Sequence, residues 1–174
     1  MGNRFYLSLG SNVGDRGNHL RAAIERLRQY GQVTSVSSFY ETEPVEFTEQ
    51  PWFLNCAVAL ETTETPAQLM ADLLSIEKTL GRQRGEKKGP RTIDIDILLA
   101  GDTMVDTPDL TIPHPAMAQR RFVLEPLAEI APEARHPVLK KKVRELLDGL
   151  PPGQLVRRIA NDQRPTTNDR VRAK

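Results

Sequence analysis

The chain has 174 residues, of which 39% are hydrophobic and 27% are charged, so it can bury one sizeable core. This composition excludes a disordered or fibrous protein. The 24 Lys and Arg nearly balance the 23 Asp and Glu, and the net charge of +1 gives no global field to attract nucleic acid or an anionic membrane. Any anion-binding site must therefore be local.

Cysteine content and the N-terminus bear on the compartment. Cys56 is the only cysteine, so no intrachain disulfide can form. No stretch approaches the roughly 20 apolar residues of a membrane span, and Tyr6 occupies the position where a myristoylation signal needs Ser or Thr. We expect an unprocessed, soluble, cytoplasmic protein. Because the chain begins at Met1, we also expect a stand-alone protein and not part of a fusion.

The first hundred residues alternate between strand and helix patterns. Residues 5–9 alternate apolar and polar side chains, whereas Leu20, Ala23, Ile24 and Leu27 follow helical spacing. The predicted elements are a strand at 5–9, a helix at 18–30, strands at 33–40 and 53–60, a helix from Thr65 to Leu80, and a strand at 92–99. This β-α-β-β-α-β order predicts a ferredoxin-like α+β fold, with one sheet and both helices on one of its faces.

The last third of the chain predicts additional short helices. Residues 122–130 and 138–150 have helical patterns, the second beginning near the lysine run 140–142, and we expect both to pack at the edge of the sheet. From residue 160 almost no side chain is apolar, so burial cannot offset the entropy of ordering. We predict a single domain at 1–159 and a flexible tail at 160–174.

The segment GPRTIDIDILL, residues 89–99, carries the strongest chemical signal. Strand alternation directs Asp94 and Asp96 to one face and Ile93, Ile95 and Ile97 to the other. Two neighbouring carboxylates suit Mg²⁺ attached to phosphates. The alternative is a half-solvated strand that merely alternates. The adjacent cations favour the metal site, because like charges side by side need compensation.

A basic segment precedes these acids. It opposes a single Glu86 with five cations: Arg82, Arg84, Lys87, Lys88 and Arg91. Arginine binds phosphate oxygens through two parallel hydrogen bonds, so this is the best local anion site. The alternative is a solvated surface loop.

Two other segments give weaker signals. Trp52, Phe53, Asn55 and Thr42 combine aromatic rings with hydrogen-bonding groups, as a slot for a flat heterocycle requires, although such aromatics are also typical of a core. His114 lies between two prolines, which is typical of a rigid turn, and Arg120 follows it.

The segment GSNVGDR places Asp15 where a Walker loop needs lysine, so we predict only a turn that caps the first helix. His19 and His136 show no partner pattern and are expected at the surface. No Cys/His cluster indicates zinc.

The sequence closely resembles the 6-hydroxymethyl-7,8-dihydropterin pyrophosphokinase family of folate biosynthesis. The matching motifs cover nearly all of residues 5–132 and are LGSNVGDR, YETEPV, QPWFLNCAVALET, LGRQR, GPRTIDIDILL and LTIPHPAMAQRRFVLEPLAEIAP. The resemblance implies a ferredoxin-like fold, in agreement with the element order above. It also implies transfer of pyrophosphate from ATP to the pterin hydroxymethyl group, with AMP as the other product. Residues beyond about 150 lie outside it.

The resemblance also implies roles for individual residues. Asp94 and Asp96 would hold two Mg²⁺ ions, and Arg82 and Arg91 would stabilise the transferring group. The residues implied in ATP binding are Glu77, Arg84, Ile97, Thr111, His114 and Arg120. Phe53 and Phe122 would enclose the pterin ring, and the residues that would read its edge are Thr42, Val45 and Asn55. No residue stands out as a general base.

Three positions depart from the family pattern. Lys88 stands where a tryptophan often precedes Gly-Pro-Arg, Leu74 replaces a polar residue of some members, and Asp109 stands where some carry arginine. Two other functions are compatible with such a sheet: a ferredoxin-like RNA-binding domain and a Mg²⁺-dependent nuclease that uses the same acids. The strand acids and the lack of a basic, aromatic RNA-binding run disfavour the first. We expect ATP and the pterin as partners, no nucleic acid, no membrane, and a monomer.

Overall fold

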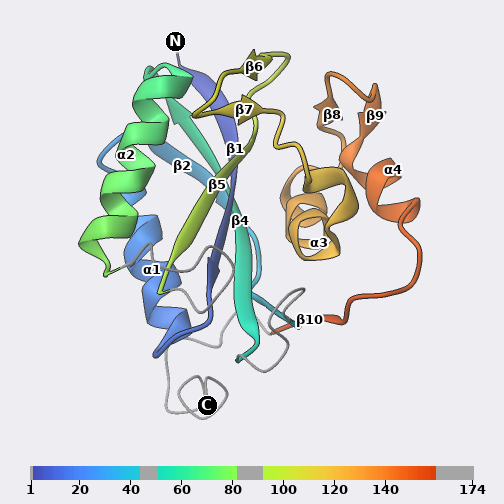
Figure 1. Ribbon diagram of the computed structural model, residues 1–174, viewed down its shortest axis with the longest axis horizontal. Helices are drawn as coiled ribbons and strands as arrows, with labels where there is room; N and C mark the ends of the chain where they lie inside the picture. Colours follow the sequence, from blue (N-terminus) through green and yellow to red (C-terminus); the bar gives the residue numbers. More distant parts are fainter. Residues whose placement is uncertain (1, 44–50, 82–91, 160–174) are drawn as a thin grey trace.

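The structure is a computed structural model that describes residues 2–43, 51–81 and 92–159. Figure 1 shows a sheet with helices on both of its faces. In chain order the elements are β1 (Asn3–Ser11), α1 (Arg16–Leu27), β2 (Gln32–Val36), β3 (Tyr40–Thr42), β4 (Phe53–Thr62), α2 (Pro66–Thr79), β5 (Asp94–Leu99), β6 (Val105–Asp106), β7 (Thr111–Ile112), η1 (Met117–Gln119), α3 (Arg121–Ile130), β8 (Arg135–His136), β9 (Lys141–Lys142), α4 (Val143–Asp148) and β10 (Val156–Arg158). Within those ranges, no helix combines the length and apolar character that crossing a membrane requires.

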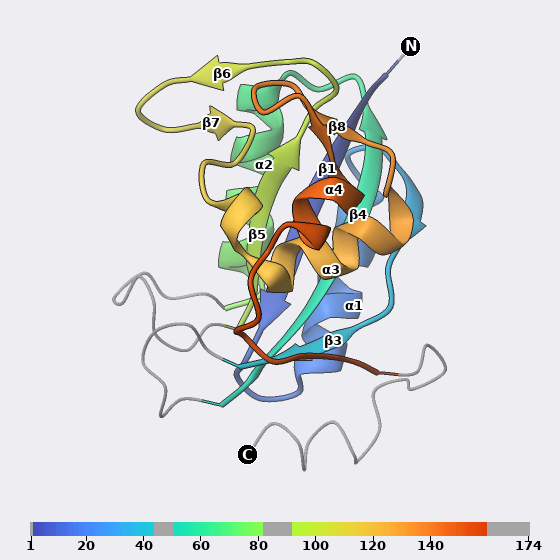
Figure 2. The same ribbon diagram turned by 90° about the vertical axis from the view of Figure 1, so that its right-hand side faces the viewer.

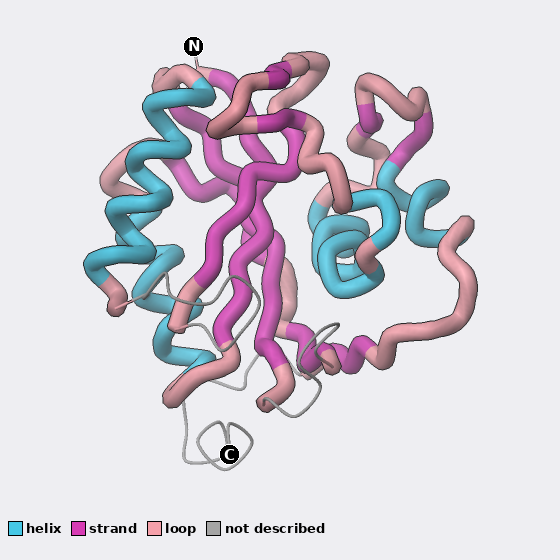
Figure 3. The backbone as a smooth tube through the Cα atoms, in the orientation of Figure 1, coloured by secondary structure: helices cyan, strands magenta, loops and turns pink. Residues whose placement is uncertain are grey.

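The main sheet has six strands and is antiparallel throughout. Its order is β10-β3-β4-β1-β5, and β2 also pairs with β4. The two longest strands, β1 and β4, lie side by side in the middle of the sheet (Figure 3). This arrangement confirms the predicted ferredoxin-like α+β fold.

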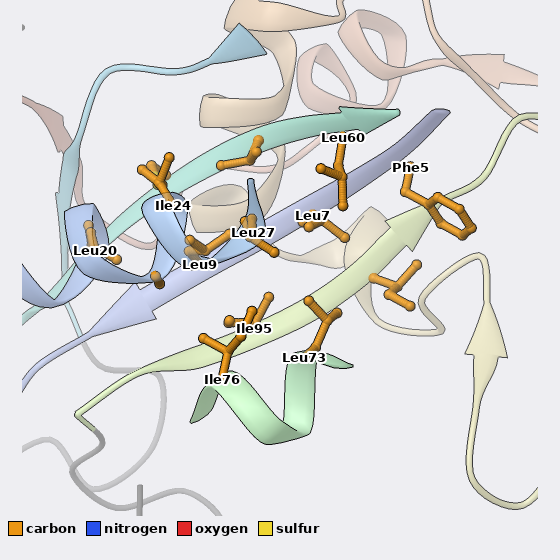
Figure 4. Packing of buried hydrophobic residues seen from close by; sticks show 14 of the residues in the cluster. Phe5, Leu7, Leu9, Leu20, Ile24, Leu27, Leu60, Leu73, Ile76 and Ile95 are labelled. Carbon is orange, nitrogen blue, oxygen red and sulfur yellow. The ribbon is translucent and has the colours of Figure 1, made fainter. Parts of the chain in front are cut away.

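Helices α1 and α2 cover one face of the sheet, as predicted. Leu20 and Leu27 of α1 pack with Leu73 of α2 against Leu9 and Ile95 of the strands (Figure 4). Helix α2 begins at Pro66 because the Thr65 hydroxyl accepts a hydrogen bond from the Gln68 backbone amide and the Gln68 side-chain oxygen accepts one from the Thr65 backbone amide. This is the larger of the two apolar cores.

Helix α3 covers part of the opposite face, whereas the sequence predicted that it would pack at the sheet edge. Leu124 and Leu127 of α3 bury Ala57, Leu98 and Leu99 of the strands. Figure 1 shows α3 across the sheet from α1 and α2, and Figure 2 shows it lying over β4. The prediction was wrong because Leu98 and Leu99 follow the two acids on β5 and give the second face an apolar half that needs its own cover.

The strand predicted at 33–40 is two strands, β2 and β3. The Ser38 amide donates to the Glu129 carboxylate of α3 at 2.9 and 3.1 Å, and the Ser37 hydroxyl accepts from the Ala57 amide at 2.8 Å. In the short stretch that joins β2 to β3, these long-range bonds take the place of regular pairing with β4.

The helix predicted at 138–150 begins only at Val143. His136 is buried, not at the surface as predicted, and its Nδ1 accepts hydrogen bonds from the amides of Val138 and Leu139 at 3.2 and 3.1 Å. Lys140 has a left-handed backbone with φ 61°, and β8 and β9 form a hairpin around it. Because this hairpin occupies residues 135–142, helix α4 begins at Val143.

Candidate active site

The carboxylates of β5 lie on the face of the sheet opposite α1 and α2. Ile95 and Ile97 are 2% and 3% exposed in the main core, whereas Asp94 and Asp96 are only partly buried. The predicted alternation is confirmed. Across the strand pair, Asp94 is opposite Gly10 of β1 and Asp96 is opposite Ser8. No group of three or more His, Cys, Asp or Glu side chains in the described ranges is placed to hold a metal ion.

Gly10 separates the acids from an amide on the next strand. It is opposite Asp94 on β5 and opposite Asn55 on β4, so the three residues form one row across the sheet. Two strand spacings, about 10 Å, separate the outer two backbones. A Cβ at Gly10 would lie 2.5 Å from Asn55 Oδ1, so any other residue would displace the amide. Because Gly10 has no side chain, nothing projects from β1 between Asp94 and Asn55.

Thr42, Phe53 and Asn55 lie together beyond this row. The Asn55 side-chain nitrogen donates to the Thr42 hydroxyl at 2.7 Å, and both residues are buried. Thr42 is opposite Phe53 in the β3–β4 pair, and the Phe53 side chain is partly exposed. The structure therefore brings these three predicted pterin residues to one end of two adjacent strands.

His114 connects β5 with the segment that leads to α3. Its amide donates to the Leu98 carbonyl at 3.0 Å, and its Nδ1 accepts from the Ala116 amide at 3.1 Å. Burial lowers the pKa of His114, the nearby Arg120 lowers it further, and Asp94 opposes this effect. His114 is therefore close enough to Arg120 and Asp94 for both charges to act on its pKa.

Arg120 in turn lies over the ring of Phe122, with 5.6 Å between its guanidinium carbon and the ring centroid. Phe122 is partly exposed at the start of α3. One predicted ATP residue, Arg120, thus contacts one predicted pterin residue, Phe122.

Three other predicted ATP residues have different settings. Glu77 is 2% exposed, and its carboxylate accepts a hydrogen bond from the Ile95 amide of β5 at 2.7 Å. Ile97 faces the main core. Thr111 lines a hollow of about 430 Å³ together with His114, Ile112 and Pro115. Val45, Arg82, Arg84 and Arg91 lie outside the described residues, as does Lys88.

A buried ion pair that no sequence pattern indicated joins α1 to β3. Asp15 caps α1 through the Asn18 amide, as predicted, but Arg16 is completely buried. It donates to the Glu41 carboxylate at 3.1 Å and to the Trp52 carbonyl at 3.0 Å. An arginine at the start of an amphipathic helix normally faces solvent, so no local pattern marks it as buried. Its partners lie 25 and 36 residues away in the chain.

The fold and the pair of carboxylates on one sheet face place the chain among ferredoxin-like α+β proteins with an acidic site. A family model, 7,8-dihydro-6-hydroxymethylpterin-pyrophosphokinase, matches residues 6–132. The chain belongs to this family.

Similar proteins with curated descriptions agree with this membership. The chain is 48% identical over 132 residues to a 2-amino-4-hydroxy-6-hydroxymethyldihydropteridine pyrophosphokinase from Bacillus subtilis, covering 75% of this chain and 79% of that one. It is 44% identical over 156 residues to the protein of the same name from Methylorubrum extorquens, covering 88% and 98%. The folic acid synthesis protein fol1 from Schizosaccharomyces pombe is 41% identical over 148 residues, which are 84% of this chain and 20% of that protein.

Solved structures support the fold. The wild-type Plasmodium falciparum HPPK-DHPS with pteroate has a TM-score of 0.69 and 17% identity, over 85% of this chain and 42% of that one. A second structure, HPPK-DHPS in complex with substrates, gives a TM-score of 0.68 at 18% identity, over 84% and 42%. The present chain spans less than half of these longer proteins, and the likeness concerns the fold alone.

Proposed function

We propose that this chain transfers pyrophosphate from ATP to the hydroxymethyl group of 6-hydroxymethyl-7,8-dihydropterin in folate synthesis. The hydroxymethyl oxygen bonds to the β-phosphorus, and the bond from that phosphorus to the oxygen bridging the α- and β-phosphates breaks. AMP leaves, the hydroxyl proton is released, and the pterin diphosphate forms. The observation that carries the proposal is the row Asp94–Gly10–Asn55, which places one of the two acids of β5 across Gly10 from the hydrogen-bonded Asn55–Thr42 pair on one face of the sheet.

Thr42, Phe53, Asn55 and Phe122, which we call the pterin slot, suit a flat heterocycle with a polar edge. Phe53 and Phe122 supply partly exposed aromatic surface, and Thr42 and Asn55 supply hydrogen-bonding groups fixed by their mutual bond. Residues fixed by a sheet hold reacting atoms in line more accurately than residues on a loop, and positioning is a large part of phosphoryl-group transfer. Val45 is included in this slot from the family resemblance.

The acids fit magnesium. Asp94 and Asp96 are hard oxygen donors on the same face of one strand, and Mg²⁺ that is carried by phosphates takes one or two carboxylates from a protein. They would hold the two ions expected from the family resemblance, and when bound these ions neutralise phosphate charge. The chain's own part is to fix both carboxylates in the rigid ladder between β1 and β5.

Basic residues complete the nucleotide side of the proposal. His114 is acted on by the charges of both Arg120 and Asp94, so we assign His114 and Arg120 to phosphate oxygens, and Arg82, Arg84 and Arg91 are assigned to the triphosphate from the family resemblance. Glu77, Ile97 and Thr111 remain proposed ATP contacts on the same basis. A monomer located in the cytoplasm also stays a prediction.

The test is substrate dependence. Purified protein with Mg²⁺ and ATP is incubated with the pterin alcohol, without it, and with single-stranded RNA or duplex DNA in its place. We expect ATP consumption only with the pterin and no change in either nucleic acid. RNA retention without catalysis, or cleavage of nucleic acid, would instead favour the RNA-binding domain or the nuclease.

A further inference from the structure

The C-terminal strand β10 lies beside the proposed pterin slot. Residues Val156–Arg158 pair with β3, and residues just before them bind Glu43 at the end of β3. The Leu155 amide donates to the Glu43 carboxylate at 2.7 Å, and the Gln154 side chain donates to the Glu43 carbonyl at 2.6 Å. This segment lies outside residues 6–132, which the family model matches.

Arg157 of β10 contacts Glu41 of β3 and Trp52, the residue that precedes β4. Its guanidinium donates to one Glu41 carboxylate oxygen at 2.9 Å and lies 5.8 Å from the centroid of the Trp52 ring. Arg16 donates to the other Glu41 oxygen and to the Trp52 carbonyl. Two arginines that share one carboxylate therefore hold Trp52 by its ring and by its backbone. Asn12 adds a bond of 3.1 Å to the carbonyl of Pro51.

Arg16 is buried and Arg157 is largely exposed, so only Arg16 is needed to compensate the buried charge of Glu41. The Arg16 side chain is 0% exposed and that of Glu41 is 6%, whereas that of Arg157 is 63% exposed. Burial acts to raise the pKa of Glu41, but hydrogen bonds from Arg157 and Arg16 outweigh it, and the pKa lies below its usual value. Without Arg157 the buried Arg16–Glu41 pair stays compensated, so the fold should survive that loss.

We propose that Arg157 is a positioning residue for the pterin and acts through Glu41 and Trp52. Glu41 precedes Thr42, and Trp52 precedes Phe53, so the contacts of Arg157 fix the backbone beside one hydrogen-bonding group and one ring of the slot. Strand β10 thereby helps to position the residues that bind the pterin. This inference rests on the proposed function. It predicts that Arg157 governs pterin affinity and leaves the nucleotide side unaffected.

The kinetic test compares Arg157→Ala with Arg158→Ala. Arg158 is the matched control because it follows on the same strand and reaches Glu129 of α3, at 3.8 Å, instead of Glu41. We expect Arg157→Ala to raise the KM for the pterin about fivefold or more, with the KM for ATP and kcat within about twofold of wild type. The control should leave all three within about twofold. An unchanged pterin KM, or an equal rise in both KM values, would overturn the proposal.

A second readout needs no turnover. Trp52 is the only tryptophan in the chain, so its fluorescence reports the contact with Arg157 directly. Acrylamide should quench this fluorescence more strongly in Arg157→Ala than in wild type or Arg158→Ala, with the melting temperature little changed. Identical quenching in all three proteins would overturn the contact. Wild-type protein that makes no AMP with the pterin would overturn the proposed function, whereas an active wild type with an unaltered Arg157→Ala variant would overturn only the positioning role.

Discussion

The two faces of the main sheet use the same strands for different purposes. On the face under α1 and α2, Leu7, Leu9 and Ile95 belong to one continuous apolar core. On the other face, α3 covers one half through Ala57 and Leu98, and the other half carries the acids of β5 and the Thr42–Asn55 pair. The comparison teaches that the alternation of a strand can divide stability from chemistry within a single element. We therefore expect mutations of neighbouring residues of β5 to have different effects, with activity lost at the acids and stability lost at the isoleucine between them.

The largest effect is expected at the acids. Asp94→Asn and Asp96→Asn should each lower kcat by about two orders of magnitude or more, because each removes a charged oxygen ligand from the phosphate-binding centre. Steady-state kinetics at saturating Mg²⁺ measures the loss, and thermal melting with circular dichroism checks that the fold persists. Near-normal turnover in either variant would break the distinction between the two faces.

Ile95→Ala, placed between the two acids, should have the opposite phenotype. Ile95 is buried in the main core, and truncation of such a side chain costs about 2–4 kcal/mol of unfolding free energy. Urea denaturation measures this loss, while kcat of the folded protein should stay within a few-fold of wild type. Lost activity without lost stability would show that the covered face also contributes to the chemistry.

Phe122→Ala sharpens the comparison within the open face. Loss of a stacking ring should weaken pterin binding by about 1–3 kcal/mol and affect ATP binding much less. Titration of each ligand by calorimetry measures both affinities. Leu124→Ala on the same helix is the structural control. Leu124 is fully buried, so its truncation should lower the stability of the fold and not ligand binding. Equal weakening of both ligands by Phe122→Ala, or a collapse in its melting temperature, would assign Phe122 to the core.

Local patterns predicted much of this architecture. The strand and helix periods of residues 5–99 gave the ferredoxin-like order, and Asp94 and Asp96 were placed on one face by alternation alone. The Thr65–Pro66 start of α2 also followed from capping chemistry. The family assignment came from the motifs, and the family match confirms it. The roles of single residues in binding stay predictions.

Features that depend on distant partners could not be predicted. Strand pairing is interrupted between β2 and β3 where Ser38 binds Glu129, a residue 91 positions away. Arg16 is buried because it binds Glu41 of β3 and the carbonyl of Trp52, which directly precedes β4. The three residues of β10 form a strand by pairing with β3, and nothing in their own composition marks them as part of the sheet. In each case a long-range hydrogen bond overrides the local preference.

The central claim, pyrophosphoryl transfer on the open face, is tested most directly by the identity of the nucleotide product. Protein, Mg²⁺, ATP and 6-hydroxymethyl-7,8-dihydropterin are incubated, and nucleotides and pterins are separated by chromatography. Attack at the β-phosphorus makes AMP the leaving group, so AMP and the pterin diphosphate should appear in equal amounts. ADP with a monophosphorylated pterin, or ATP breakdown at the same rate without the pterin, would contradict the account.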